Sequence, residues 1–148
     1  MKNAKYIVIV LLLLLAYLIA GCSLLSQKPI EFKLYQNEEQ ITEISRAFVA
    51  EDKALSQSSI DIKETASGEQ LVPTIRALRE MPCKEPSFEP RDTPYGACFM
   101  IKYADGSFQL LSECRNDYFD KEYHSQGYQS LEFDVEEFNS LWNKGIGD

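Results

Sequence analysis

The longest apolar stretch of the chain is residues 6–20, fifteen positions without a charge. It has no polar face at helical spacing, which argues against an amphipathic core helix. Lys2 and Lys5 precede it and small residues follow it, as in a secretory signal. It is also shorter than the roughly 17–25 residues that span a membrane. The pattern therefore predicts an export signal.

After the signal, the hydrophobic pattern changes between strand and helix spacing. Residues 30–35 alternate apolar and polar side chains, which predicts a half-buried strand. Asn37 with Gln40 three positions later resembles a capping box, and we expect a helix over residues 38–53. The apolar face of that helix consists of Ile41, Ile44, Ala47 and Phe48.

A second unit follows a loop at residues 56–59. Residues 60–65 predict a strand with Ile60 and Ile62 on one face, and residues 69–81 predict a helix. Pro73 allows that helix to begin no earlier than residues 70–72. Its expected buried face is Leu71, Val72, Ile75 and Leu78. The two units match as an internal strand–helix repeat, or they are two amphipathic helices that share common residue types.

The rest of the chain is marked by turn residues. Prolines at every fourth position predict a surface loop over residues 82–94, and Asp105-Gly106 predicts a hairpin within residues 97–114. Residues 115–128 have the composition of an acidic, aromatic loop. Residues 131–133 predict a short strand, and Asp134 predicts the cap of a final helix that ends before Gly145.

These elements give the order strand-helix-strand-helix-hairpin-strand-helix. We therefore expect an α+β fold, with a mostly antiparallel sheet and the helices packed on one face. The domain organisation that follows is a removed signal at 1–21, a tether at 22–29 and a single domain at 30–148.

The end of the apolar stretch, Ile19-Ala20-Gly21-Cys22, resembles the lipobox of bacterial lipoproteins. The resemblance implies that Cys22 receives a diacylglyceryl group and becomes the first residue after cleavage, with palmitate among its acyl chains. Ser23 in place of Asp implies the periplasmic side of the outer membrane in a two-membrane bacterium, and otherwise the outer face of the cell membrane. The alternative is an uncleaved anchor over residues 6–25, which leaves the domain exported in either case.

Charge narrows the range of partners. Without the signal, the chain has about 127 residues and a net charge of about −10. This charge argues against nucleic acid, whose binding requires phosphate neutralisation. The expected partners are the membrane, through the N-terminal lipid, and an envelope protein. The tether reaches roughly 23 Å at about 3.3 Å per residue, so the domain is expected to work close to its membrane.

Residues 60–144 also resemble small exported lipoprotein domains of unknown function. The similarity rests on a strand, a helix ending in Leu-x-x-x-Pro at Leu78, a Tyr-x-Asp-Gly-Ser hairpin at Tyr103 and a closing helix. It implies a fold and no activity.

Three cysteines remain after lipidation of Cys22, in a compartment that permits disulfides. If Ala104-Asp105-Gly106 is a three-residue loop, Cys98 lies opposite Ser112, and Cys114 lies diagonally on the same face. We therefore expect a Cys98–Cys114 bridge, with Cys83 as the alternative partner. The other interpretation is that all three are small buried apolar residues.

Candidate chemistry is sparse in this sequence. His124 lies near Asp117, Asp120 and Glu122, but the spacing matches no recognised metal site, and no nucleophile or phosphate-loop motif is present. We expect no catalytic residue, no metal and no cofactor.

Aromatic residues in the acidic loop indicate either a binding surface or side chains that cover the open end of the core. They are Tyr118, Phe119, Tyr123 and Tyr128. We therefore expect a non-catalytic interaction module, such as an assembly factor, inhibitor or immunity-type partner. The alternatives are a structural lipoprotein without a ligand, or a small metal- or thiol-dependent enzyme.

Overall fold

The computed structural model describes residues 7, 10–12, 27–51, 53–87 and 94–146, so Cys22 and the lipobox lie outside the described residues. Within those ranges, no helix has both the length and the apolar character needed to span a membrane. The elements from residue 27 onward are β1 (Pro29–Ile30), η1 (Glu38–Gln40), β2 (Ile41–Val49), η2 (Gln57–Ser59), β3 (Ile60–Ser67), η3 (Gly68–Gln70), α2 (Leu71–Glu80), β4 (Cys83–Lys84), β5 (Gly96–Tyr103), β6 (Phe108–Ser112), β7 (Arg115–Phe119), β8 (Ser125–Ser130), β9 (Glu132–Phe133) and α3 (Val135–Lys144).

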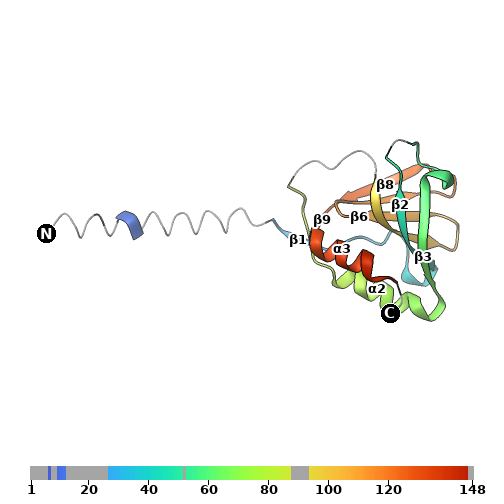
Figure 1. The fold of residues 1–148 in the computed structure, drawn as a ribbon, viewed down its shortest axis with the longest axis horizontal. Helices are drawn as coiled ribbons and strands as arrows, with labels where there is room; N and C mark the ends of the chain where they lie inside the picture. The colour runs from blue at the N-terminus through green and yellow to red at the C-terminus, as the bar shows by residue number, and fades with distance from the viewer. Residues whose placement is uncertain (1–6, 8–9, 13–26, 52, 88–93, 147–148) are drawn as a thin grey trace.

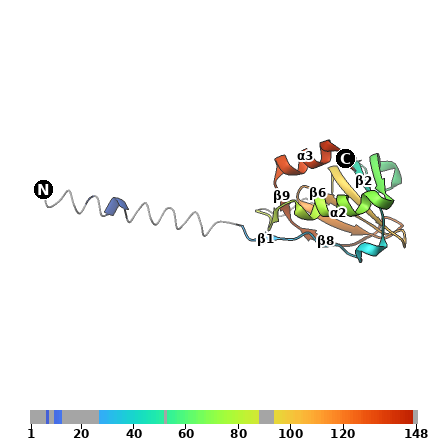
Figure 2. The ribbon, with the colours of Figure 1, turned by 90° about the horizontal axis from the view of Figure 1, so that it is seen from below.

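A six-stranded sheet in the order β3-β2-β5-β6-β7-β8 forms the centre of the domain, and its neighbouring strands run antiparallel. Both long helices lie on one side of it (Figures 1 and 2). Leu78 of α2 and Phe138 of α3 enter the same apolar cluster as Phe99 and Ile101 of β5. The predicted α+β class, with helices on one face of an antiparallel sheet, is confirmed.

The opposite face of the sheet has an apolar core of its own. Because successive side chains of a strand point to opposite faces, Cys98 and Met100 of β5 face away from the helices. They join Val49, Leu110 and Phe119 in a second buried cluster. Leu55, Ile60, Tyr95 and Tyr123 pack against it as partly buried residues.

The helix predicted over residues 38–53 is wrong, because this segment forms a 3₁₀ turn and then the central strand β2. The pairing of β2 with β5 shifts register between Ile41 and Glu43, which is a bulge. The bulge places Ile41 and Ile44 in the helix-side cluster although they are three residues apart, a spacing that imitates a helix. Ala47 faces the other cluster. The strand–helix repeat is therefore wrong as well.

The loop predicted over residues 115–128 is also wrong, because the segment forms β7 and β8. Its polar composition suggested exposure, yet Arg115, Asn116 and Asp117 are all buried. Burial is tolerated because each of these side chains has a hydrogen-bonding partner in the fold.

Turns and caps follow the sequence closely. The Tyr103 amide donates to the Ser107 carbonyl at 2.9 Å, and Gly106 has φ +85°, so the three-residue hairpin loop is confirmed. Helix α2 begins at Leu71, although Val72 is exposed rather than buried. Asp134 caps α3 by accepting from the Glu137 amide at 3.0 Å.

Residues 31–36 cross the helix side of the sheet, and we call them the crossing segment. A strand was predicted for residues 30–35, but only Pro29–Ile30 pairs, with β4, in a small sheet of order β1-β4-β9. The predicted alternation of burial is retained, since Phe32 is buried and Leu34 packs against the helix-side cluster. Side chains of the large sheet form hydrogen bonds with the backbone of this segment in place of a neighbouring strand.

Candidate interaction site

The two aromatic residues of β7 pack inside the fold, Phe119 as a buried core residue and Tyr118 as a partly buried one. Tyr118 lies on the helix side, where its ring stacks on Tyr35 with centroids 4.8 Å apart and its hydroxyl accepts from the Gln36 side-chain Nε2 at 3.0 Å. Phe119 lies on the other side and stacks on Phe108 with centroids 5.3 Å apart. Strand alternation thus separates two residues that were expected to share a surface.

The other two aromatic residues differ in exposure. Tyr123 is partly buried against Phe108, with ring centroids 5.1 Å apart. Tyr128, in β8, remains 57% exposed. The predicted four-residue aromatic surface is therefore wrong as a single patch, and Tyr128 is the member that the fold leaves most available to a partner.

A buried ion pair supports Tyr128 from beneath. The Arg115 Nε lies 2.7 and 2.8 Å from the two carboxylate oxygens of Asp117. The Arg115 guanidinium carbon is 4.1 Å from the centroid of the Tyr128 ring, which is a cation–π contact. Burial raises the pKa of the Asp117 carboxyl, against the lowering effect of Arg115. The ion pair therefore fixes the position of the Arg115 guanidinium, and the exposed Tyr128 ring packs against that guanidinium.

Strand β8 forms one edge of the large sheet, and β3 forms the other. The two edges differ in charge. Strand β3 carries Asp61, Lys63 and Glu64, whereas β8 has the sequence SQGYQS without a charged side chain. Charged side chains on an edge strand discourage pairing with another chain. Strand β8 lacks that protection, although a bulge opposite Tyr118 and Phe119 interrupts its first residues.

A row of side-chain amides on the helix side binds the backbone of the crossing segment. Gln129 accepts from the Lys33 amide at 2.7 Å and donates to the Glu31 carbonyl at 2.8 Å. Asn116 donates to the Lys33 carbonyl at 2.8 Å, and Gln109 accepts from the Tyr35 amide at 3.2 Å. These bonds fix the chain that leads from the tether into the domain. No local sequence pattern predicts these hydrogen bonds, since the partners lie up to 98 positions apart.

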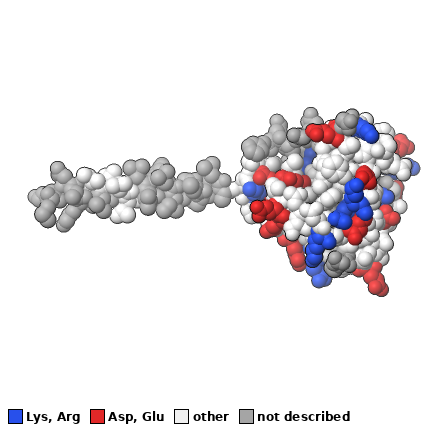
Figure 3. Space-filling view, viewed as in Figure 1, with Lys and Arg blue, Asp and Glu red and all other residues white. Residues whose placement is uncertain are grey.

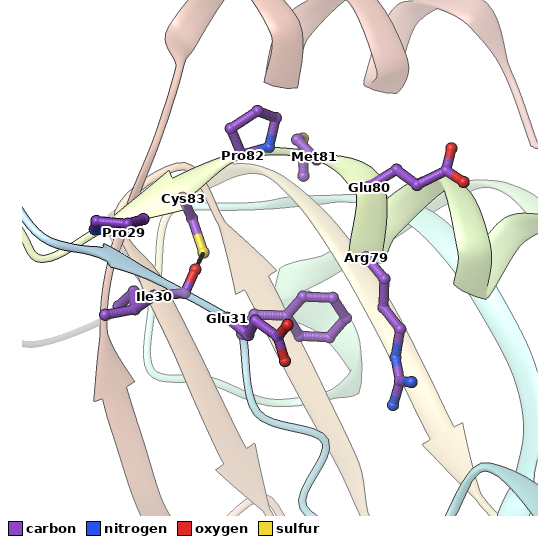
Figure 4. A pocket seen from close by; sticks show the side chains of 9 residues that line it. Pro29, Ile30, Glu31, Arg79, Glu80, Met81, Pro82 and Cys83 are labelled. Carbon is purple, nitrogen blue, oxygen red and sulfur yellow. Dashed lines mark hydrogen bonds between the residues drawn. The ribbon is translucent and has the colours of Figure 1, made fainter.

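A cavity of about 290 Å³ lies beside Cys83, where the chain enters the domain (Figure 4). The Cys83 thiol points at the Ile30 carbonyl and donates to it at 3.1 Å. Burial raises the pKa of this thiol, which disfavours the reactive thiolate. On the cavity wall, Arg79 forms an ion pair with Glu38 at 2.8 Å. The Cys83 thiol therefore links β4 to β1 through its hydrogen bond. It is not an activated nucleophile, because its pKa is raised.

The expected Cys98–Cys114 bridge is not formed in the structure, where Cys98 is a buried free thiol. Cys98 does lie opposite Ser112, as predicted. However, β6 ends at Ser112 and the chain reverses through residues 113 and 114, because Ser112 pairs with Arg115 across the next hairpin. Cys114 thus lies in an exposed turn rather than further along β6. Cys83 is also a free thiol, in the other sheet.

The residues around His124 form a hydrogen-bonded turn. The Asp120 carboxylate accepts from the His124 backbone amide at 2.9 Å and lies 3.2 Å from Nδ1 of the His124 ring. Asp117 forms its ion pair with Arg115 instead. Hydrogen bonds from the backbone amides of His124 and Glu122 lower the pKa of Asp120. Across the ranges that the structure describes, no group of three or more His, Cys, Asp or Glu side chains is placed to hold a metal ion.

Comparisons with protein-family models, curated proteins and solved structures find no match to this chain. The surface in the view of Figure 1 carries acidic and basic side chains interspersed (Figure 3). The chemistry that the described residues offer is therefore a charge-free strand edge, with one exposed aromatic ring held by a buried ion pair.

Proposed function

We propose that the protein is a lipid-anchored lipoprotein of the bacterial envelope whose domain acts as a non-catalytic protein-interaction module. The anchor rests on the resemblance of residues 19–22 to a lipobox and on Cys22 as the lipidated residue. Residues 23–28 then allow roughly 20 Å of reach, at about 3.3 Å per residue, before the chain enters β1. The crossing segment, bound by the amide row, keeps that tether short by fixing its domain end.

The observation that carries the interaction role is Tyr128, 57% exposed on an edge strand without charge. Aromatic residues and arginine are enriched in the energetically important parts of interfaces. Here the ring and the Arg115 guanidinium already form one unit. Pairing with an edge strand is a common way to recognise another chain.

The test uses the full-length, tagged protein in its own membranes. Cys22→Ser is expected to abolish palmitate labelling and to leave the signal at residues 1–21 uncleaved. Tyr128→Ser is expected to abolish capture of the protein's partner after cross-linking in the membrane. Val72→Ser, which removes another exposed apolar side chain on α2, is the matched control and should leave capture unchanged.

Palmitate labelling or signal cleavage that persists in Cys22→Ser would contradict lipidation at Cys22. Capture that persists in Tyr128→Ser, or that fails equally in Val72→Ser, would contradict the assigned surface.

A further inference from the structure

The outer edge of β8 is open within the described part of the chain, because β8 is the last strand of its sheet. An edge strand presents a row of backbone N–H and C=O groups that are ready to pair with another strand. Residues Gly127 to Ser130 keep a regular register with Tyr118 to Arg115, so this part of the edge is straight enough to continue the sheet.

The side chains of β8 suit a copy of the same strand. Serine, glutamine and tyrosine each carry a hydrogen-bond donor and an acceptor, so any two of these side chains can bond to one another where they lie opposite. A charged strand would repel its own copy. The mature chain carries a net charge of about −10, yet none of it lies on β8. Charge on the strand itself therefore does not oppose the pairing of two copies at this edge.

We infer that two copies of this chain pair through β8 in an antiparallel dimer, with Tyr128 on the two-fold axis. In such a dimer the two-fold axis is perpendicular to the sheet, so side chains on one face of the first copy lie on the same face in the second copy. Because side chains alternate between faces along a strand, opposed residues must be an even number of positions apart. One residue therefore lies opposite its own copy. Gln129 is committed to the crossing segment, and Gly127 offers no side chain. Of residues 127–130, which keep a regular register, Tyr128 is the exposed one, which gives a cross-strand aromatic pair.

The dimer rests on the proposed function, because it depends on the lipid anchor for its concentration. A pair of short edge strands buries little area, and interfaces of that size are weak in solution. Anchoring both copies in one membrane raises their effective concentration. The Arg115 guanidinium lies beneath each ring, so the two rings form the centre of a rigid stack.

The test is cysteine cross-linking of the lipidated protein in its membrane, in a Cys114→Ser background. Directly opposed residues in an antiparallel pair have Cα atoms about 4.5–5.5 Å apart, within the range of a disulfide. Tyr128→Cys is expected to give a reducible dimer under mild oxidation. Ile62→Cys on β3 and Val72→Cys on α2 are the matched exposed controls and should give none.

A second variant keeps the test independent of the introduced thiol. Donor and acceptor fluorescent proteins are fused to the C-termini of separate copies, and energy transfer between the copies is measured in vesicles. Energy transfer should persist in Tyr128→Phe and be lost in Tyr128→Glu, which places two negative charges on the axis. Because β8 carries no charge, the native signal should survive high salt.

Three results would overturn the dimer. They are equal cross-linking at all three cysteine positions, energy transfer that Tyr128→Glu does not change, and a Tyr128→Cys cross-link to a different protein. The last result would still support an interaction module, so failure of the dimer and failure of the proposed function are distinguishable.

Discussion

Tyr103 shows at the scale of one residue how burial sets chemistry in this domain. It is 2% exposed, and its hydroxyl donates to the Gln109 side chain. Burial raises its pKa from the usual 10.0 of a tyrosine to about 12. A raised value means that the folded protein holds the proton more tightly than the unfolded chain. The stability it contributes is therefore complete below pH 10.0 and is lost as the pH rises toward 12.

We predict that Tyr103→Phe reduces the alkaline loss of stability. The variant should be about 1 kcal/mol less stable at neutral pH, because it loses a hydrogen bond. Its urea midpoint should fall less steeply than that of the native protein above pH 10.0. Part of the slope remains, since burial also raises the pKa of Tyr35. Tyr128→Phe, at an exposed position, is the control, and equal slopes in all three proteins would rule out this role for Tyr103.

At the scale of elements, the crossing segment behaves as a strand whose pairing partner is a set of side chains. Gln109, Asn116 and Gln129 come from β6, β7 and β8 and bond the backbone of residues 31–35. Two of them, Gln109 and Asn116, are fully buried. Buried amides are costly without partners, so the segment and the row stabilise each other.

We predict that Gln129→Leu loosens the crossing segment without unfolding the domain. The Lys33 amide loses its acceptor, and its hydrogen-exchange protection should fall by roughly 5- to 30-fold, which corresponds to one or two kcal/mol. The Tyr35 amide should change less, because Gln109 still accepts from it. Gln126→Leu is the control, since that amide bonds to Asp120 in the turn. Unchanged exchange at Lys33 would show that Gln129 does not hold the segment.

At the scale of the whole molecule, one sheet separates two cores. Phe99 and Ile101 of β5 enter the helix-side cluster, whereas Cys98 and Met100 enter the other. Neither core can come apart without disrupting β5, which lies between β2 and β6. The domain should therefore unfold as one cooperative unit.

The buried thiols of Cys83 and Cys98 allow a test of this cooperativity, because one lies in each cluster. We predict that maleimide labels both only after unfolding, with coincident urea midpoints in pulse-labelling experiments read by mass spectrometry. Cys98 labelling at a clearly lower midpoint would show that the second core opens independently. A Cys98 that stays unlabelled in the unreduced, unfolded protein would instead reveal the bridge to Cys114 that the sequence suggested.

The sequence by itself determined the elements whose signals are local. The Asp105-Gly106 turn, the Asp134 cap, the start of α2 next to Pro73 and the α+β class all depend on residues within a few positions of one another. The export signal and Cys22 belong to the same kind of inference and stay predictions.

Only the tertiary structure decided that residues 41–49 form the strand β2, that the polar residues of β7 are buried and that β8 lies at the edge of the sheet. A bulge set by pairing with β5 gave β2 its helix-like spacing, and no property of residues 41–49 alone reveals it. Asn116 is buried because Lys33 and Gln109 satisfy it, one of them 83 positions away. Local sequence fixes turns and caps because their partners are neighbours. Burial of polar groups and exposure of Tyr128 depend on partners that only the completed sheet brings together.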